Sequence, residues 1–326
     1  MNKTAIYHVC LSSHEEVMFR SAEDLRMGFN CLAAAALATE SRLLADGFMT
    51  THFHALVQTA SVQQFMYRAR NAYSRYFNTK YSRSGRLGEK RYFSLEIEGH
   101  YHTLAALNYV IRQGLHHGLA NTPFEYPFCS ATAYFRQELG RTAIPPLLND
   151  RSRHRYLPSN VIIPLKYRMS ADGQLLREDV LDVTWVEQNY ITPQNFSYHM
   201  NRIANERDIQ EQKEENQLPP VTLEAIEKGV PGFVLKEAQI FEKEHGVRNA
   251  MTDLEFCSYL DKQLLPRIVK GTPDPTIFML SDSRRAELGT WIWRKYNEVK
   301  FKNISGKVFS SKTITEPQLR RCLALK

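Results

Sequence analysis

The alternation of apolar and polar positions in the first 120 residues predicts three strands and three helices in alternating order. β-Branched and aromatic residues mark the strands, and apolar residues at a helical period mark the helices. The strands are expected at residues 4–11, 48–59 and 91–98, and the helices at 21–45, 61–81 and 102–114. Gly47 is expected to break the first helix, and Gly114 to close the third.

Strands interleaved with helices in this way predict an α+β fold of the ferredoxin-like type, in which a mainly antiparallel sheet carries helices on one face. The pattern changes after Pro145-Pro146, where an arginine-rich segment and then a short β-like run at 161–167 follow. We therefore expect two units, residues 1–145 and 146–326. The second unit is expected to be an accessory region that is mostly helical.

Three features organise the second unit. Residues 205–217 (NERDIQEQKEENQ) are almost wholly polar, which indicates a solvated helix or a linker. A helical run follows Ser281-Asp282-Ser283 and contains Arg284 and Trp291, and residues 300–312 come after it. Thr315 followed by Pro317 is a helix start signal near the C-terminus. None of these features indicates a function.

Composition sets mild limits on the class of protein. The chain has 42 Lys plus Arg against 35 Asp plus Glu, a formal charge of +7, which favours a polyanionic partner without requiring one. Its five cysteines form no Cys-x-x-Cys pair, which argues against a disulfide framework and a zinc knuckle. No apolar stretch is long enough for a membrane span. We expect a cytoplasmic protein without a membrane partner.

The first candidate chemistry is the triplet His52-Phe53-His54 in the strand expected at 48–59. Side chains at i and i+2 of a strand point to the same face, so both imidazoles emerge together while Phe53 points the other way. Two neutral imidazoles on one face are half of a divalent metal site. A His-x-His triplet also occurs by chance, so the triplet needs support from elsewhere in the chain.

That support comes from Tyr109 and Gln113, which lie four residues apart in the helix expected at 102–114 and so share a face. A phenol with a pKa of about 10 needs help to attack a phosphodiester, and a nearby cation can supply it. Gln113 could complete the ligand set of the metal. Alternatively, Tyr109 only anchors the helix by burying its ring.

In order along the chain, these motifs resemble those of the single-tyrosine HUH transposases, the family to which the REP-associated tyrosine transposases belong. The resemblance covers about residues 4–136. It rests on Tyr7-His8-Val9, on Gly47-Phe48-Met49 ahead of the His-Phe-His triplet, and on Tyr109-Val110-Ile111. The tyrosine follows the histidines, whereas relaxases usually place it before them.

The resemblance implies a metal-dependent nuclease and strand transferase that acts on single-stranded or hairpin DNA. Tyr109 would attack the scissile phosphorus and become linked to the 5′ phosphate. His52, His54 and Gln113 would hold Mg²⁺ or Mn²⁺. His100, His102, His116 and His117 flank the tyrosine helix and are expected to lie outside this ligand set. The active unit is expected to be either a monomer or a homodimer.

Basic residues near the tyrosine are the candidate DNA contacts. Arg68 and Arg75 share one stripe of the helix expected at 61–81, although a solvated helix face explains them equally well. The loop at 83–91 is a better candidate, because its two glycines and its cations could follow a DNA backbone closely. Its candidate contacts are Arg83, Arg86, Lys90 and Arg91.

Three functions remain open from the sequence. The leading one is the transposase-like nuclease and strand transferase. The second is a replication-initiator or relaxase-like nickase with the same chemistry but another DNA target. The third is a domesticated DNA-binding protein that does not cleave. The accessory region after residue 145 either recognises a DNA end or hairpin, or serves only structure or dimerisation.

Overall fold

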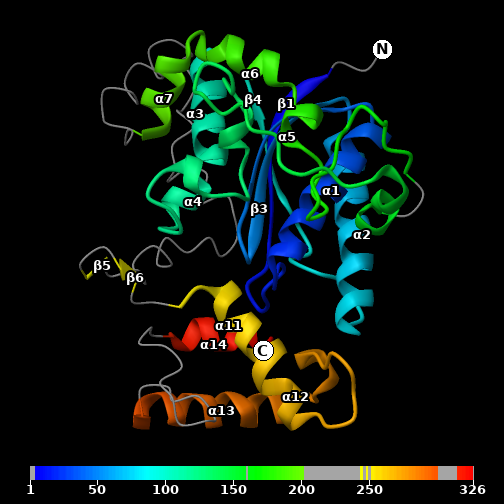
Figure 1. Ribbon diagram of the computed structural model, residues 1–326, viewed down its shortest axis with the longest axis vertical. Coiled ribbons are helices and arrows are strands. Elements are labelled where there is room, and N and C mark those ends of the chain that lie inside the picture. The colour runs from blue at the N-terminus through cyan, green and yellow to red at the C-terminus, as the bar shows by residue number, and fades with distance from the viewer. Residues whose placement is uncertain are drawn as a thin grey trace.

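A four-stranded antiparallel sheet in the order β2-β3-β1-β4 forms the centre of the molecule (Figure 1). The strands are β1 (Ala5–Ser12), β2 (Arg42–Phe48), β3 (His52–Thr59) and β4 (Phe93–Ile97). The computed structural model describes residues 4–158, 161–201, 243–244, 247–248, 251–299 and 314–325. None of the helices in these ranges is both long and apolar enough to cross a membrane.

Two long helices connect the strands and cover one face of the sheet. They are α1 (Ala22–Ala38) and α2 (Val62–Tyr81), and each begins at a serine whose hydroxyl accepts a hydrogen bond from a backbone N–H of the first turn. The resulting order β-α-β-β-α-β is that of ferredoxin-like α+β folds. The predicted mixed α+β class with a mainly antiparallel sheet is confirmed.

The strand β2 was missed by the sequence pattern, which extends the first helix to residue 45. The helix instead ends at Ala38, and Glu40 adopts a positive φ of 49° that turns the chain back toward the sheet. Leu43 and Leu44 are then buried in β2, which pairs with β3. Gly47 therefore lies inside a strand and does not break a helix. The predicted strand at 48–59 begins only at His52.

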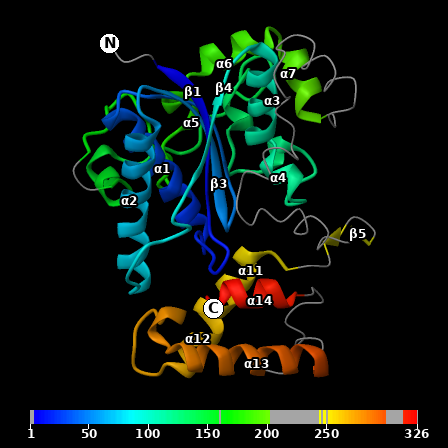
Figure 2. The same cartoon turned by 180° about the vertical axis from the view of Figure 1, so that it is seen from behind.

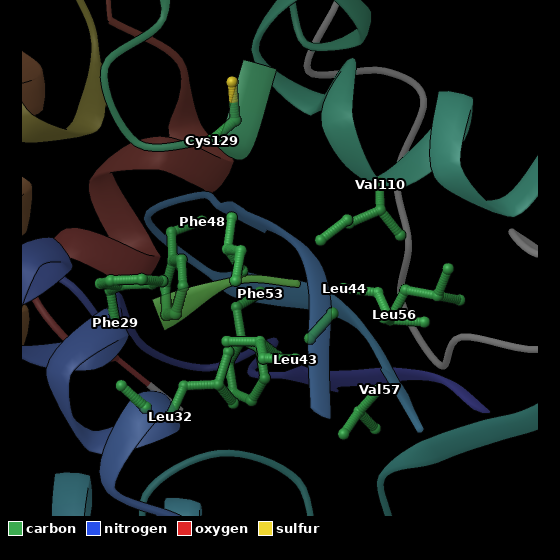
Figure 3. Close-up of a cluster of buried hydrophobic side chains, with 14 of the residues drawn as sticks. Phe29, Leu32, Leu43, Leu44, Phe48, Phe53, Leu56, Val57, Val110 and Cys129 are labelled. Carbon is green, nitrogen blue, oxygen red and sulfur yellow. The ribbon is translucent and has the colours of Figure 1, made fainter. Parts of the chain in front are cut away.

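Helices also cover the opposite face, which corrects the expectation of helices on one face only. There lie α3 (His100–Ile111) and the short α4 (Gln113–His116), so the helix expected at 102–114 is two helices. Figures 1 and 2 show them across the sheet from α1 and α2. In Figure 3, Phe53 lies toward Phe29 of α1, whereas Leu56 lies toward Val110 of α3.

Residues 161–201 pack onto the sheet and its helices. They contain α5 (Arg177–Val180), α6 (Val183–Tyr190) and α7 (Pro193–Asn201). Val186 and Phe196 belong to the same hydrophobic core as the sheet. The described residues 161–167 form no strand, so the short β-like run expected there is not confirmed. The division into units at residue 145 stays a prediction.

The described C-terminal residues form a second, mostly helical core. It contains α11 (Asp253–Tyr259), α12 (Leu265–Ile268), α13 (Asp282–Val299) and α14 (Glu316–Cys322). The helix start signal at Thr315 and Pro317 is confirmed, since Thr315 caps α14. A small hairpin, β5 (Lys243–Glu244) with β6 (Val247–Arg248), precedes this core. The segments predicted at 205–217 and 300–312 lie outside the described residues.

Buried polar contacts join this C-terminal core to one end of the sheet. Arg20, only 2% exposed, donates to both carboxylate oxygens of Asp261 at 2.8 and 3.1 Å. Thr50, in the turn between β2 and β3, donates to Asp253 of α11 at 2.9 Å. Asp253 in turn accepts two hydrogen bonds from Arg321 of α14 at 2.9 Å. The C-terminal core is therefore bonded to the turn that directly precedes His52.

Candidate active site

Both histidines of the His-Phe-His triplet lie on β3 and point toward the face that α3 covers. Their ring centroids are 5.1 Å apart, and the side chains are buried, with His52 5% and His54 0% exposed. Phe53 points the other way and stacks on Phe48 with ring centroids 5.2 Å apart. This arrangement follows from the two-residue period of the strand.

Tyr109 of α3 and Gln113 of α4 lie at the same site as the two histidines, on the face of the sheet that these helices cover. The ring of Tyr109 meets that of His54 edge to face, with centroids 5.0 Å apart. The helix is interrupted at Arg112, yet Gln113 keeps its place because its side-chain amide donates to the backbone oxygen of Tyr109 at 3.1 Å. Tyr109 is 4% and Gln113 0% exposed. The structure thus brings together the four residues singled out in the sequence.

Gly47 allows the tyrosine helix to lie this close to the sheet. A Cβ atom at this position would stand 2.4 Å from the backbone oxygen of Val110 and 3.1 Å from Cγ of Gln113. Gly114 has a similar role and does not close α3, since a Cβ there would meet the ring of Tyr126 at 2.2 Å. Both glycines are required by close contacts.

A third histidine, His8, was missed as a site residue by sequence reasoning. It lies on β1, next to β3 in the sheet, and its Nε2 is 2.9 Å from Nδ1 of His54. Nδ1 of His52 is similarly 3.0 Å from Oγ1 of Thr51. Because these contacts engage Nδ1 of each triplet histidine, a metal would be bound through Nε2.

Two further histidines lie closer to the cluster than the sequence suggests. The ring centroid of His117 is 5.0 Å from that of His52, and the ring centroid of His116 is 6.1 Å from that of Tyr109. Both lie at the end of α4, His116 as its last residue and His117 as the residue that follows it. Only the fold could reveal this, because the sequence places both residues at a helix end.

Burial keeps these imidazoles neutral. It lowers the pKa of His8 to about 3 and that of His52 to about 4, although a hydrogen bond with Gln113 acts to raise the pKa of His52. The pKa values of His54 and His117 are well below 6.5, mainly through burial and also through the neighbouring histidines. At neutral pH the cluster therefore presents free-base imidazole, which is the form that binds metals.

The donor set fits one divalent ion held by two imidazoles and an amide. Among the described residues, no group of three or more His, Cys, Asp or Glu side chains has the arrangement of a metal site. A site here would therefore depend on the amide oxygen of Gln113 as well as on His52 and His54. The anchored Nδ1 atoms and the neutral rings are the observations in favour of that fit.

The candidate DNA contacts separate into two groups. Arg86, Lys90 and Arg91 are exposed in the loop at 83–91. This loop lies at the end of β1, because the N–H of Glu89 donates to the backbone oxygen of Ser12, which pairs with His52. These three cations therefore lie at the same end of the sheet as the triplet.

The other candidates are placed differently. The guanidinium of Arg83 forms an ion pair with Glu16 and also donates to Asn78 at 3.0 Å, so it anchors the loop. Arg68 and Arg75 are exposed on α2, across the sheet from Tyr109. They cannot contact a DNA strand that is bound at the tyrosine. If they bind DNA, they do so at another surface of the protein.

No family model matches the chain, and no curated protein matches it. Among solved structures, the chain is similar to a REP-associated tyrosine transposase bound to a REP hairpin, with 11% sequence identity and a TM-score of 0.35. The match covers 44% of this chain and 83% of the other.

Proposed function

We propose that this protein is a metal-dependent single-stranded DNA endonuclease and strand transferase that acts through a 5′-phosphotyrosine intermediate. The observation that carries the proposal is the convergence of Tyr109 with the neutral imidazoles of His52 and His54 and with Gln113 in one buried cluster. A nucleophile beside a set of metal-binding groups is what metal-dependent phosphodiester transfer requires.

The proposed reaction is a transesterification. The phenolic oxygen of Tyr109 attacks phosphorus, the bond from phosphorus to the 3′ oxygen breaks, and the strand on the 5′ side leaves with a 3′ hydroxyl. Reversal by another 3′ hydroxyl joins strands without ATP. A divalent ion held by His52, His54 and Gln113 would polarise the phosphoryl oxygens when bound.

His116 is the group proposed to accept the phenolic proton. Its ring centroid is 6.1 Å from that of Tyr109, and burial and Arg112 lower its pKa, so that the imidazole is neutral at pH 7. Unlike His8, which is fully buried against His54, His116 is partly exposed, which favours it as the residue that would pass the proton on to solvent. A positioned base of this kind typically contributes about 10²–10⁴-fold to rate.

DNA must also reach a tyrosine that is only 4% exposed. The basic loop residues Arg86, Lys90 and Arg91 are proposed to hold the strand backbone at this end of the sheet. DNA binding would then shift α4, whose His116 ring centroid is 6.1 Å from that of Tyr109, and so uncover the tyrosine. Hydrogen exchange in residues 113–118 should accordingly rise when DNA is added.

The test is a denaturing gel of protein incubated with Mn²⁺ and a random-sequence pool of single-stranded DNA. The intermediate retains the 3′ part of the strand, so a 3′ label should appear on the protein and a 5′ label should not. Tyr109→Phe and His54→Ala should abolish the adduct, whereas Tyr101→Phe, a change on the same helix, should leave it intact.

Each alternative has its own outcome. Undiminished adduct in Tyr109→Phe contradicts the assigned nucleophile. DNA binding without any adduct in the wild-type protein supports the domesticated protein that does not cleave. Adduct formation without transfer to an added strand bearing a 3′ hydroxyl supports a nickase.

A further inference from the structure

A large groove lies on the side of the sheet opposite the tyrosine, at the helices that cover that face. It has a volume of about 590 Å³ and runs between α1, α2 and the segment that contains Arg155 and Leu157. Figures 1 and 2 show α1 and α2 on one side of the sheet and α3 and α4 on the other. The groove is therefore separate from the cluster around Tyr109.

Positive charge is concentrated along this groove. Arg68 and Arg75 line it from α2, and Arg155 lines it from the facing segment. All three are exposed, and within the described ranges none of them takes part in an ion pair. Lys80 is a fourth cation, but Asp24 accepts from it at 2.7 Å, so its charge is compensated. The three arginines leave a local excess of positive charge.

The remaining walls suit a flat, partly apolar group. The floor is formed by small side chains of α1, which leave the backbone of that helix close to the groove: Cys31, Ala34, Ala35 and Ala38. Tyr67 stands at the rim with 70% of its surface exposed. An exposed aromatic ring beside arginines is an arrangement with which proteins bind single-stranded DNA, since bases stack on the ring and phosphates pair with the cations.

We propose that this groove is a second single-stranded DNA site, distinct from the site of cleavage. Arg68, Arg75 and Arg155 bind successive phosphates, and a base stacks on Tyr67. The choice of DNA as the ligand rests on the proposed function, but the groove itself does not depend on Tyr109. A strand held on both faces of the sheet would keep a flanking segment attached while the cut end is exchanged.

The experiment measures binding of a labelled oligothymidine by fluorescence anisotropy at several salt concentrations. The protein carries Tyr109→Phe, and EDTA is present, so that cleavage plays no part. Substituting Arg68, Arg75 and Arg155 together by Ala should reduce the slope of log affinity against log salt by about 2, because each neutralised phosphate of a single strand contributes roughly 0.7 to that slope. Arg284→Ala, an exposed arginine on α13, should leave the slope unchanged.

A photocrosslink gives a second measurement that does not depend on substitutions. Oligothymidine containing 5-iododeoxyuridine should crosslink to the peptide that contains Tyr67. An unchanged salt slope in the triple variant, or crosslinks confined to residues 86–117, overturns the proposal.

The two proposals fail separately. If the triple variant loses DNA binding while the protein with Tyr109 intact never forms a covalent adduct, the groove is supported and the proposed catalysis is contradicted. If the adduct forms normally while DNA binding does not depend on the three arginines, the proposed catalysis is supported and the groove is contradicted.

Discussion

Gly47→Ala tests whether the close approach of the tyrosine helix to the sheet positions the nucleophile. The new Cβ would stand 2.4 Å from the backbone oxygen of Val110. Restoring even a tight contact of 3.0 Å requires a movement of about 0.6 Å, and the partner is helix backbone that cannot rotate away. Because Tyr109 and Gln113 flank Val110, both must move with it.

The expected magnitudes follow from that displacement. Overpacking should lower the free energy of unfolding by about 1–3 kcal/mol. Misplacement by about 1 Å can cost about 10²-fold in rate, so a shift of about 0.6 Å should slow adduct formation by about 10–100-fold. DNA binding should change little, because the cations of the loop at 83–91 do not move with α3.

Gly28→Ala is the matched control. Its Cβ would stand 2.6 Å from Cε1 of Phe19 and 2.8 Å from Cε1 of Phe48, so it overpacks the opposite face of the sheet. It should destabilise the protein to a similar degree, in urea unfolding, while the rate of adduct formation by the folded fraction stays within about threefold. Equal adduct rates for the two variants would refute the positioning role of Gly47.

Three further predictions concern the surroundings of the site. His8→Phe removes the partner of His54 and should weaken Mn²⁺ binding about 10–100-fold in an electron paramagnetic resonance titration, whereas His14→Ala should not; equal affinities would contradict the role of His8. Mn²⁺ should support faster adduct formation than Mg²⁺, because imidazole suits Mn²⁺ better than the harder Mg²⁺; a faster reaction with Mg²⁺ would point to an oxygen-rich ligand set. Asp253→Asn should lower the free energy of unfolding by about 3 kcal/mol, since Asp253 is buried and paired with Arg321, while the exposed Asp274→Asn should change it by less than about 0.5 kcal/mol.

The contribution of Asp253 should also depend on pH. Burial alone would raise the pKa of this carboxyl group, but Arg321, Thr50 and Gln318 lower it below its usual 3.8. A carboxyl pKa that is lower in the folded state stabilises the protein above the unfolded value, and that stabilisation is lost as pH falls through the folded value. The difference in unfolding free energy between wild type and Asp253→Asn should therefore shrink below about pH 4.

The elements that carry the proposed chemistry could largely be predicted from the sequence. The two-residue period of a strand is enough to place His52 and His54 on one face, and helical spacing brings Gln113 near Tyr109. These are local properties of the backbone. They require no knowledge of which other elements pack against them.

Properties that depend on tertiary packing could not be predicted. Leu43-Leu44-Ala45 fits a helix as well as a strand, and only pairing with β3 decides in favour of β2. Gly47 looks like a helix breaker until Val110 is seen to lie against it. His8 and His117 join the site from β1 and from the end of α4, and nothing in their local sequence indicates a ring to contact.

The most direct test of the proposed chemistry is to locate the covalent bond. Protein incubated with Mn²⁺ and single-stranded DNA is digested with nuclease and protease, and the modified peptide is identified by mass spectrometry. We predict a nucleotide joined through its 5′ phosphate to the peptide that contains Tyr109. A phosphate joined to any other residue, or one joined through a 3′ linkage, would contradict the proposed mechanism.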